Sequence, residues 1–449
     1  MKLCSEKISS EVFYIAKKLT SAGFEAYLVG GAVRDIIFGL VPDDYDILTD
    51  ARSSDIRRLF HNVVPYGIKH GTLIVVVGKK PFDVSSYNEG EPAPLSLNND
   101  LASRDFTINA MACDLNDLEL IDLFGGVSDY RAGLIRCVPE AQDRFLKDPL
   151  RLLRAVRQAA KFGFTIEKNT FASARELSKL IENPAPERIM SELTKLLSIG
   201  SDSISKYVKY LVELNLFYNI FKKYFDSSVD ETICSEKLFN EKIYAAFDSL
   251  RGENYRLKLA FLILFGYYEL LKGRKEIVPL KKTRRALFDM KFCAEDFEYI
   301  SSLVFLVERE ISLNKTGALE NVKSVDVKEA MIDFLEASKM KVDTCEVFIL
   351  CKLVCDVYDY NVRTKTYSEA INVARTVISA SEPVYIEDLA IDGNCVKDIL
   401  KAGAGPLIGV ALKHAQRIVI KDVTRNTREY LLTALREKFA DVVALKQIK

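Results

Sequence analysis

The chain has 449 residues, enough for roughly three domains, and its apolar content of 49% and charged content of 28% are ordinary for a globular protein. The formal net charge is zero, which excludes a global basic signature of nucleic-acid binding, so any affinity for RNA must come from local patches. No apolar run approaches the ~18 residues of a membrane span, and nine cysteines without a C-x-x-C pair indicate reduced thiols, so we expect a cytoplasmic protein without a membrane partner.

The first 140 residues alternate between helical and strand-like patterns. Apolar positions with a helical period predict a helix over 8–20, which Gly23 follows. The remaining predicted elements are a strand at 26–29, a Gly-Gly turn at 30–31, helices at 32–38 and about 53–60, and strands at 44–49, 62–66, 72–77 and 81–86. This segment is predicted to be mixed α/β.

From about residue 145 the pattern becomes helical and stays so. Apolar residues from Leu150 to Phe164 have helical spacing, and 187–197 form another amphipathic segment. Polar stretches near 222–238 and 311–326 predict linkers or long loops, and a basic segment runs from about 382. Cys351 and Cys355, four apart on a predicted helix, indicate core packing.

Two carboxylates separated by one residue, Asp44 and Asp46, point to the same face of a predicted strand. Two such charges about 4 Å apart repel by roughly 4 kcal/mol at an effective dielectric near 20. A divalent cation removes that penalty, and hard oxygen ligands suit Mg²⁺. The alternative is a surface turn rich in Asp.

Residues near this pair strengthen the case for a phosphate and metal site. Gly30 and Gly31 allow backbone N–H groups to approach phosphate oxygens at the start of a helix, and Arg34 adds a fork-shaped donor. Asp83, on an alternating strand, is a candidate third catalytic carboxylate facing the same metals, or an ordinary solvent-facing residue.

Two downstream segments combine charged and amide side chains. Arg104, Asp105 and Asn109 lie in the segment 103–110, where Ser103 is also a candidate helix N-cap that would leave them as solvated residues. Asp148 precedes Pro149 and is a candidate N-cap, with Arg151 and Arg154 on the same helix face. Asp148, Arg151 and Arg154 either present acceptors and donors to a base edge or form a helix cap and an exposed basic stripe.

Six ordered segments over about 170 residues resemble the motifs of class II tRNA nucleotidyltransferases, the CCA-adding enzymes, which bacterial poly(A) polymerases share. They are 28–35, 44–46, 104–110, 122–126, 148–151 and 187–193. The resemblance resumes at 389–393, 405–409 and 426–429, which are similar to the tRNA-holding tail of CCA-adding enzymes, and it covers 200–380 only as a helical run.

The resemblance implies an α+β fold: a polymerase-β-like nucleotidyltransferase head with a mixed sheet at 1–140, then a helical neck at 141–200, a helical body at 201–380 and a helical tail at 381–449. It also implies addition of C and A to the 3′ end of tRNA from CTP and ATP. Asp44 and Asp46 would hold two Mg²⁺ ions, and Gly30, Gly31 and Arg34 would cradle the triphosphate. Asp105 would contact the ribose, and Asp148 and Arg151 would pair with the base edge. The full set of expected nucleotide contacts adds Arg104, Asn109 and Arg154.

Three features of the chain, two single residues and one segment length, depart from the family pattern. Lys147 stands where Glu is usual, and Ser103 stands where a first Arg is usual. The stretch between Tyr87 and Arg104 is short, as in enzymes that add only CC and leave the final A to a partner. We therefore carry CC-only addition as a hypothesis beside CCA addition.

Two other functions are alternatives, and two basic surfaces are candidates for RNA binding. The chain is alternatively a poly(A) polymerase or a catalytically inactive RNA-binding relative. Basic clusters at 272–285 and 413–428 are candidate phosphate contacts for tRNA, and the protein is expected to be a monomer or a dimer.

Overall fold

The computed structural model describes residues 1–65, 71–89, 96–200, 204–221, 239–270, 280–313, 327, 330, 342–358, 361–380, 382–383, 385–400 and 405–440. Contacts divide the chain into two units, Met1–Lys237 and Leu238–Lys449, and each is described by itself. The predicted boundaries at 140, 200 and 380 remain predictions.

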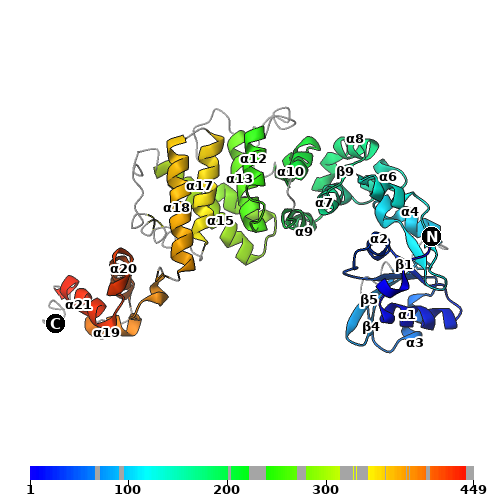
Figure 1. Cartoon of the computed structure of the whole chain (residues 1–449), viewed down its shortest axis with the longest axis horizontal. Coiled ribbons are helices and arrows are strands. Elements are labelled where there is room, and N and C mark those ends of the chain that lie inside the picture. The colour runs from blue at the N-terminus through cyan, green and yellow to red at the C-terminus, as the bar shows by residue number, and fades with distance from the viewer. Residues whose placement is uncertain are drawn as a thin grey trace. The chain divides into compact units, whose positions relative to one another are not determined.

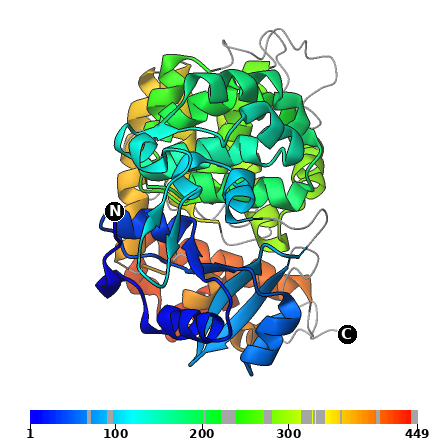
Figure 2. The same cartoon turned by 90° about the vertical axis from the view of Figure 1, so that its right-hand side faces the viewer.

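A seven-stranded mixed sheet forms the centre of the first 140 residues (Figure 2). The strand order is β3-β4-β5-β2-β1-β6-β7, and only β2 and β5 run parallel among neighbouring pairs. The strands are β1 (Tyr27–Val29), β2 (Asp46–Thr49), β3 (Val63–Pro65), β4 (Thr72–Val77), β5 (Lys80–Ser86), β6 (Ala112–Asp114) and β7 (Leu120–Ile121). The predicted mixed α/β head is confirmed.

Alternation along the strands gives the sheet two different apolar faces. Leu28 and Ile47 point into a core shared with α1 (Ser10–Ser21), α2 (Gly31–Ile37) and α3 (Ser53–Leu59). Val29 and Leu48 point to the opposite face, where they pack with Leu101 of α4 (Leu97–Ser103). Asp46 precedes Leu48 by two residues and therefore shares the α4 face.

One predicted cap in the head is wrong. Ser103 does not start a helix; it is the last residue of α4, and Arg104 follows it with extended backbone (φ −69°, ψ 171°). The helix starts earlier because the Ser96 hydroxyl accepts a hydrogen bond from Asn99 N. The head also contains α5 (Gly126–Arg131) and the 3₁₀ turns Ser5–Lys7 and Thr107–Asn109.

The rest of the first unit is helical, as predicted, apart from one strand. The strands β8 (Leu134–Ile135) and β9 (Thr165–Ile166) form a parallel two-stranded ladder, so the predicted neck carries a short strand. Its helices are α6 (Ala141–Lys147), α7 (Arg151–Phe162), α8 (Lys168–Glu176), α9 (Pro186–Leu197), α10 (Ile204–Glu213) and α11 (Leu216–Phe221), with a 3₁₀ helix at Ser178–Glu182.

All the secondary-structure elements described in the second unit are helices (Figure 1). The helices are α12 (Glu241–Asp248), α13 (Tyr255–Leu270), α14 (Leu280–Asp289), α15 (Ala294–Leu313), α17 (Thr344–Val357), α18 (Asn361–Ser379), α19 (Gly393–Leu400), α20 (Pro406–Lys421) and α21 (Arg428–Lys438), with 3₁₀ turns at Ile386–Asp388 and Val423–Arg425. Because α15 continues to Leu313, the loop predicted from residue 311 begins too early; the rest of that loop and the predicted linker at 222–238 lie outside the described residues.

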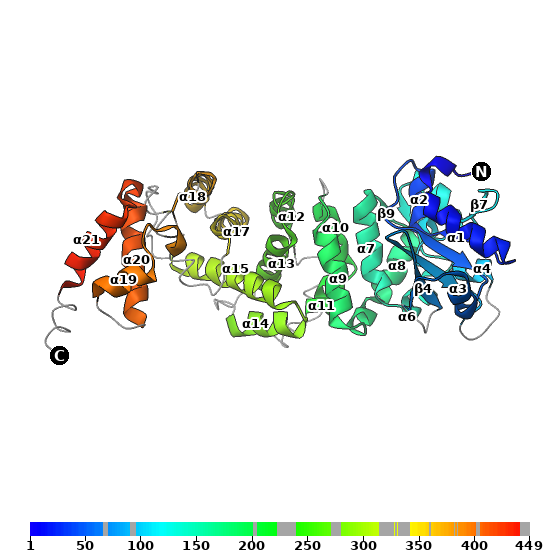
Figure 3. The same ribbon diagram turned by 90° about the horizontal axis from the view of Figure 1, so that it is seen from below.

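The last three helices share an apolar core of their own (Figure 3). Val396, Val419 and Leu431, one from each helix, are fully buried in it. Cys351 and Cys355 are buried on α17, which confirms the predicted core packing, and no disulfide joins the cysteines among the described residues. Among the helices that the structure describes, none is both long and apolar enough to cross a bilayer.

One buried carboxyl in α15 makes the stability of the second unit depend on pH. Glu308 is 3% exposed, and its Oε1 has no hydrogen-bond partner. Burial raises the pKa of Glu308 from 4.5 to about 8. The folded state therefore binds the proton more tightly than the unfolded chain, so stability present below pH 4.5 is lost as the pH rises toward 8.

We expect Glu308→Gln to remove this loss, since a neutral amide has no proton to release. The melting temperature of the variant should exceed that of the wild type by several degrees at pH 8 and by much less at pH 5, at roughly 2–4 °C per kcal/mol. Thermal unfolding followed by circular dichroism at both pH values measures this. The control is Glu437→Gln, at an exposed position of α21; an equal effect of Glu308→Gln at both pH values would contradict the argument.

Candidate functional site

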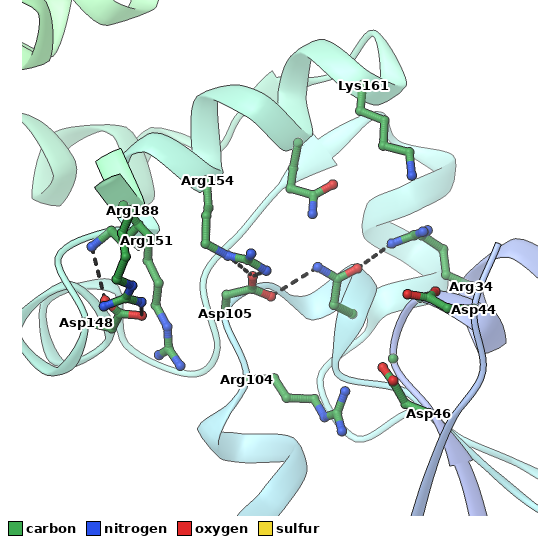
Figure 4. Close-up of a pocket in the computed structure, with 15 residues that line it drawn as sticks. Arg34, Asp44, Asp46, Arg104, Asp105, Asp148, Arg151, Arg154, Lys161 and Arg188 are labelled. Carbon is green, nitrogen blue, oxygen red and sulfur yellow. Dashed lines mark hydrogen bonds and ion pairs between the residues drawn. The ribbon is translucent and has the colours of Figure 1, made fainter. Parts of the chain in front are cut away.

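A pocket of about 490 Å³ opens in the first unit, between the sheet-bearing head and helices α7 and α9 (Figure 4). It gathers every predicted nucleotide-binding residue and both predicted metal ligands. The lining residues are Gly30, Gly31, Arg34, Asp44, Asp46, Arg104, Asp105, Asn109, Asp148, Leu150, Arg151, Arg154, Gln158, Lys161 and Arg188. Asp83 is not among them.

Gly30 permits a close approach that a side chain would block. It has φ +75°, and a Cβ there would lie 2.7 Å from Nη1 of Arg104 and 3.6 Å from Oδ2 of Asp46. The second glycine, Gly31, is the first residue of α2. Because Gly30 has no side chain, the guanidinium of Arg104 can lie against the backbone of the Gly-Gly turn, near the carboxylate of Asp46.

Two of the three predicted catalytic carboxylates, Asp46 and Asp83, lie on neighbouring strands, whereas Asp44 precedes β2, so the strand predicted from residue 44 begins at Asp46 instead. Asp46 begins β2, and its partner in the parallel ladder is Asp83 of β5. Burial raises the pKa of Asp46 to about 6, and the charges of Asp44 and Asp83 add to the shift, while Arg104 opposes it. Burial and then Asp44 also raise the pKa of Asp83. Burial, more than repulsion between the carboxylates, therefore raises these two pKa values.

This donor set fits Mg²⁺ with oxygen ligands contributed by a substrate. Among the described residues, no three or more His, Cys, Asp or Glu side chains gather closely enough to hold a metal alone. Mg²⁺ is commonly held by one or two carboxylates together with substrate phosphates. Asp44 and Asp46 are two pocket carboxylates that could serve in this way, and the charge of Asp83 acts on Asp46.

A continuous set of hydrogen bonds joins α2 to α7 across the pocket (Figure 4). The Arg34 guanidinium donates to Oδ1 of Asn109, and Asn109 Nδ2 donates to Oδ1 of Asp105 at 3.0 Å. Oδ2 of Asp105 accepts from Nε and Nη2 of Arg154 at 3.0 and 2.6 Å. Arg34 is also bonded to Asp35 and lies 4.5 Å from the centre of the Phe162 ring.

Asp105 is the most heavily bonded carboxylate of this set. Burial works to raise its pKa, yet the charge of Arg154 and the hydrogen bonds from Asn109, Arg154 and Phe106 N hold the pKa below its ordinary value. Asp105 is therefore a permanent anion that orients Arg154. Arg154 also approaches Glu192 of α9 at 3.7 Å, and Glu192 is buried.

Gly126 positions the turn that carries Asn109. A Cβ at Gly126 would lie 2.3 Å from the carbonyl oxygen of Thr107, so only glycine lets α5 pack against Thr107–Asn109. Asp122 caps α5 by accepting from the backbone N–H groups of Gly126 and Val127 at 2.7 and 3.0 Å. The segment 122–126 thus supports the site without entering the pocket.

The opposite end of the pocket contains Asp148, Arg151 and Arg188 (Figure 4). Asp148 is not an N-cap as predicted: α7 begins at Arg151, after a turn in which Arg151 N donates to the carbonyl of Asp148. Oδ1 of Asp148 accepts from Leu150 N at 3.2 Å, and Oδ2 from Arg188 at 3.3 Å. Arg151 donates Nη2 to the carbonyl of Ser103 at 2.9 Å, while its buried Nη1 has no partner.

Four lining residues were not predicted from the sequence: Leu150, Gln158, Lys161 and Arg188. Helical spacing was a usable signal for two of them, because Gln158 and Lys161 follow Arg151 by seven and ten residues and share its face. Arg188 lies in a segment that the motif comparison had singled out. Lys147 is an exposed residue at the end of α6 and does not line the pocket. The short segment before Arg104 lies partly outside the described residues, because 90–95 are not described.

Residues 26–136 match the model of the Poly A polymerase head domain, and residues 163–227 match that of the probable RNA and SrmB-binding site of polymerase A. The CCA-adding enzyme of Oceanobacillus iheyensis is 40% identical over 213 residues, which are 45% of this chain and 52% of that protein. The CCA-adding enzyme of Lactococcus lactis subsp. cremoris MG1363 is 39% identical over 202 residues, 42% of this chain and 50% of that protein. The matched region thus spans about half the length of these relatives.

The fold extends the similarity to nearly the whole chain. The crystal structure of the Bacillus stearothermophilus CCA-adding enzyme in complex with CTP has a TM-score of 0.69 and 25% identity, covering 96% of this chain and 97% of that one. The Thermotoga maritima CCA-adding enzyme complexed with tRNA has the same fold, with a TM-score of 0.61 and 18% identity over 97% of both chains. The predicted fold class is confirmed by these likenesses.

The central position of Asn109 in the hydrogen-bonded set is testable through stability. We expect Asn109→Ala to lower the free energy of unfolding by about 2 kcal/mol, since it removes one hydrogen bond from the buried Arg34 and one from the buried Asp105. Chemical denaturation followed by circular dichroism measures the change. The control Asn116→Ala, at an exposed position of the same unit, should change stability little; equal effects of the two variants would contradict the assignment.

Proposed function

We propose that this chain, which carries the poly A polymerase head domain and the adjoining RNA-binding region, is a nucleotidyltransferase that adds C and A residues to the 3′ end of tRNA from CTP and ATP. One observation carries the proposal. A single pocket combines the Gly-Gly turn, the two carboxylates and the pair Asp148 and Arg151. The names of the relatives favour a tRNA substrate over poly(A) synthesis.

Asp44 and Asp46 are the residues that we propose hold Mg²⁺. Bound there, the metal lowers the pKa of the RNA 3′-hydroxyl and neutralises charge on the α-phosphate and the leaving pyrophosphate. Arg34, Arg104 and Lys161 surround the same end of the pocket with positive charge. These cations balance a triphosphate, and Gly30 keeps the backbone close enough for its contact with the ligand.

Asp148 and Arg151 are proposed to read the base at the other end. A carboxylate offers only acceptors and a guanidinium only donors, so together they pair with the donors and acceptors of cytosine and adenine. The unpartnered Nη1 of Arg151 is a donor available to such a base. Arg188 of α9 forms an ion pair with Asp148. The Glu that is usual at position 147 is expected to influence how Asp148 is held.

CC-only addition stays a proposal beside CCA addition. Its support is the short segment 88–102 and the charge of Lys147 beside Asp148. We also propose a cytoplasmic location, which the absence of disulfides among the described residues supports. Whether the protein is a monomer or a dimer stays a prediction.

Incubation with a tRNA that lacks its CCA end, with CTP and ATP, tests the activity and its product. Completion to CCA supports the first form of the proposal, and products that stop at CC support the second. Long A-tails on a generic RNA primer would instead indicate a poly(A) polymerase. Asp44→Ala and Asp46→Ala should each reduce incorporation of both nucleotides by about a thousandfold, because each removes a metal ligand. Activity retained in these variants would overturn the assignment, and an inactive wild type would indicate an RNA-binding relative.

The basic cluster of α14 is a second test, and the structure separates its two arginines. Arg284 is bonded to Glu298 and Ser301 and lies over Phe297, so its replacement would disturb the fold. The side chain of Arg285 is 76% exposed and pairs only on the surface with Asp289. The other half of the cluster, 272–275, lies outside the described residues.

We expect Arg285→Glu to raise the KM for tRNA severalfold and to leave the KM for CTP unchanged, because one phosphate contact is replaced by repulsion. Steady-state kinetics at two salt concentrations measure this. Arg58→Glu is the matched control, since Arg58 is 79% exposed and also pairs with an Asp of its own helix. If both variants leave the KM for tRNA unchanged, Arg285 does not contact tRNA.

A further inference from the structure

Two buried polar atoms in the pocket have no hydrogen-bond partner, and both belong to α7. They are Nη1 of Arg151 and Oε1 of Gln158. The first is already explained as a donor for the base. The second is unexplained: Gln158 is 7% exposed, and a buried carbonyl oxygen without a partner carries a free-energy cost. A ligand that supplies a donor would recover that cost.

Asp105, the residue that the family resemblance assigns to the ribose, has its acceptors occupied by the protein. Oδ1 accepts from Phe106 N and Asn109 Nδ2, and Oδ2 accepts two hydrogen bonds from Arg154. A carboxylate offers about four lone-pair sites, so these four bonds use them all. A sugar hydroxyl that donates to Asp105 would have to displace one of them, whereas the Gln158 oxygen is unoccupied.

Gln158 also stands at the appropriate level along α7. Figure 4 shows Arg151 beside Asp148 at one end of the pocket and Lys161 on the side of Arg34 and Asp44 at the other, with Arg154 and Asp105 between them. Gln158 follows Arg154 by one turn and precedes Lys161 by three residues, on the same helix face. In a nucleotide the ribose connects the base to the phosphates, so the middle of α7 faces the sugar.

We propose that Gln158 hydrogen-bonds a ribose hydroxyl of the incoming nucleotide and so selects ribonucleotides over deoxyribonucleotides, while Asp105 positions Arg154. This inference rests on the proposed function and names a specificity residue of its pocket. A carboxamide suits a hydroxyl because each both donates and accepts. Rotation about the last torsion of the glutamine exchanges oxygen and nitrogen without changing the shape of the group.

The test compares the kcat/KM of the first C addition for CTP, 2′-deoxy-CTP and 3′-deoxy-CTP. Gln158→Met keeps the volume and removes both polar atoms. We expect it to lower kcat/KM for CTP about fivefold and to leave unchanged the value for the analogue that lacks the contacted hydroxyl, since it removes one hydrogen bond. The two analogues distinguish the 2′- from the 3′-hydroxyl. Gln158→Glu keeps an acceptor between Arg154 and Lys161 and should retain most of the discrimination.

The matched control is Gln142→Met, because Gln142 is an exposed glutamine of α6 outside the pocket and its replacement should change none of the three values. If Gln158→Met lowers kcat/KM equally for all three nucleotides, or for none, the inference is overturned. If the wild type incorporates no nucleotide, the proposed function fails separately. Titration calorimetry then decides on Gln158: tighter binding of CTP than of both deoxy analogues, lost in Gln158→Met, supports the contact, and equal binding overturns it.

Discussion

The hydrogen-bonded path Arg34–Asn109–Asp105–Arg154 is the interaction on which the pocket depends. It begins on α2, immediately after the Gly-Gly turn, and ends on α7, the helix that faces the opposite wall. Each buried charge on the path is bonded to its neighbour. Pairs of this kind contribute little net stability compared with apolar packing, but removing one member leaves the other uncompensated. Their value here is geometric, because they fix two walls of one cavity with respect to each other.

The surrounding packing serves the same geometry. Phe162 lies beneath the guanidinium of Arg34, and Gly126 lets α5 press against the turn that carries Asn109. At the far end, Glu192 of α9 approaches Arg154 and bonds Arg157. Cationic side chains that would repel one another in isolation are thus held apart by interposed anions and amides. The charged side chains of the pocket are thus already in place in the protein alone.

The short-range motifs were enough to predict most of this site from the sequence. Asp44, Asp46, Gly30 and Arg34 were identified because chemistry and spacing agreed within twenty residues. The mixed sheet followed from alternation and from the positions of glycine. What failed was local capping: Ser103 and Asp148 have the right chemistry for N-caps, yet Ser96 starts the earlier helix, and a turn at Pro149 delays the later one.

Tertiary information was missing from the sequence for the remaining features. No pattern in the chain indicates that the four acceptor sites of Asp105 are used internally, since the donors come from residues up to 49 positions away. The position of Asp83 beside Asp46 depends on the pairing of β2 with β5, which no local pattern indicates. Gln158 and Lys161 were accessible in principle, because they follow Arg151 and Arg154 by seven residues each, and residues seven apart share a helix face.

The parallel ladder between β2 and β5 determines where this protein can tolerate a change of length. Side chains alternate between faces with a period of two, so an insertion or deletion of one residue within β2 would turn Asp46 into the core around Ile47 and bring an apolar side chain to the pocket. A change of length by one residue within these two strands is therefore incompatible with the pocket, even where the residue gained or lost has no chemical role of its own.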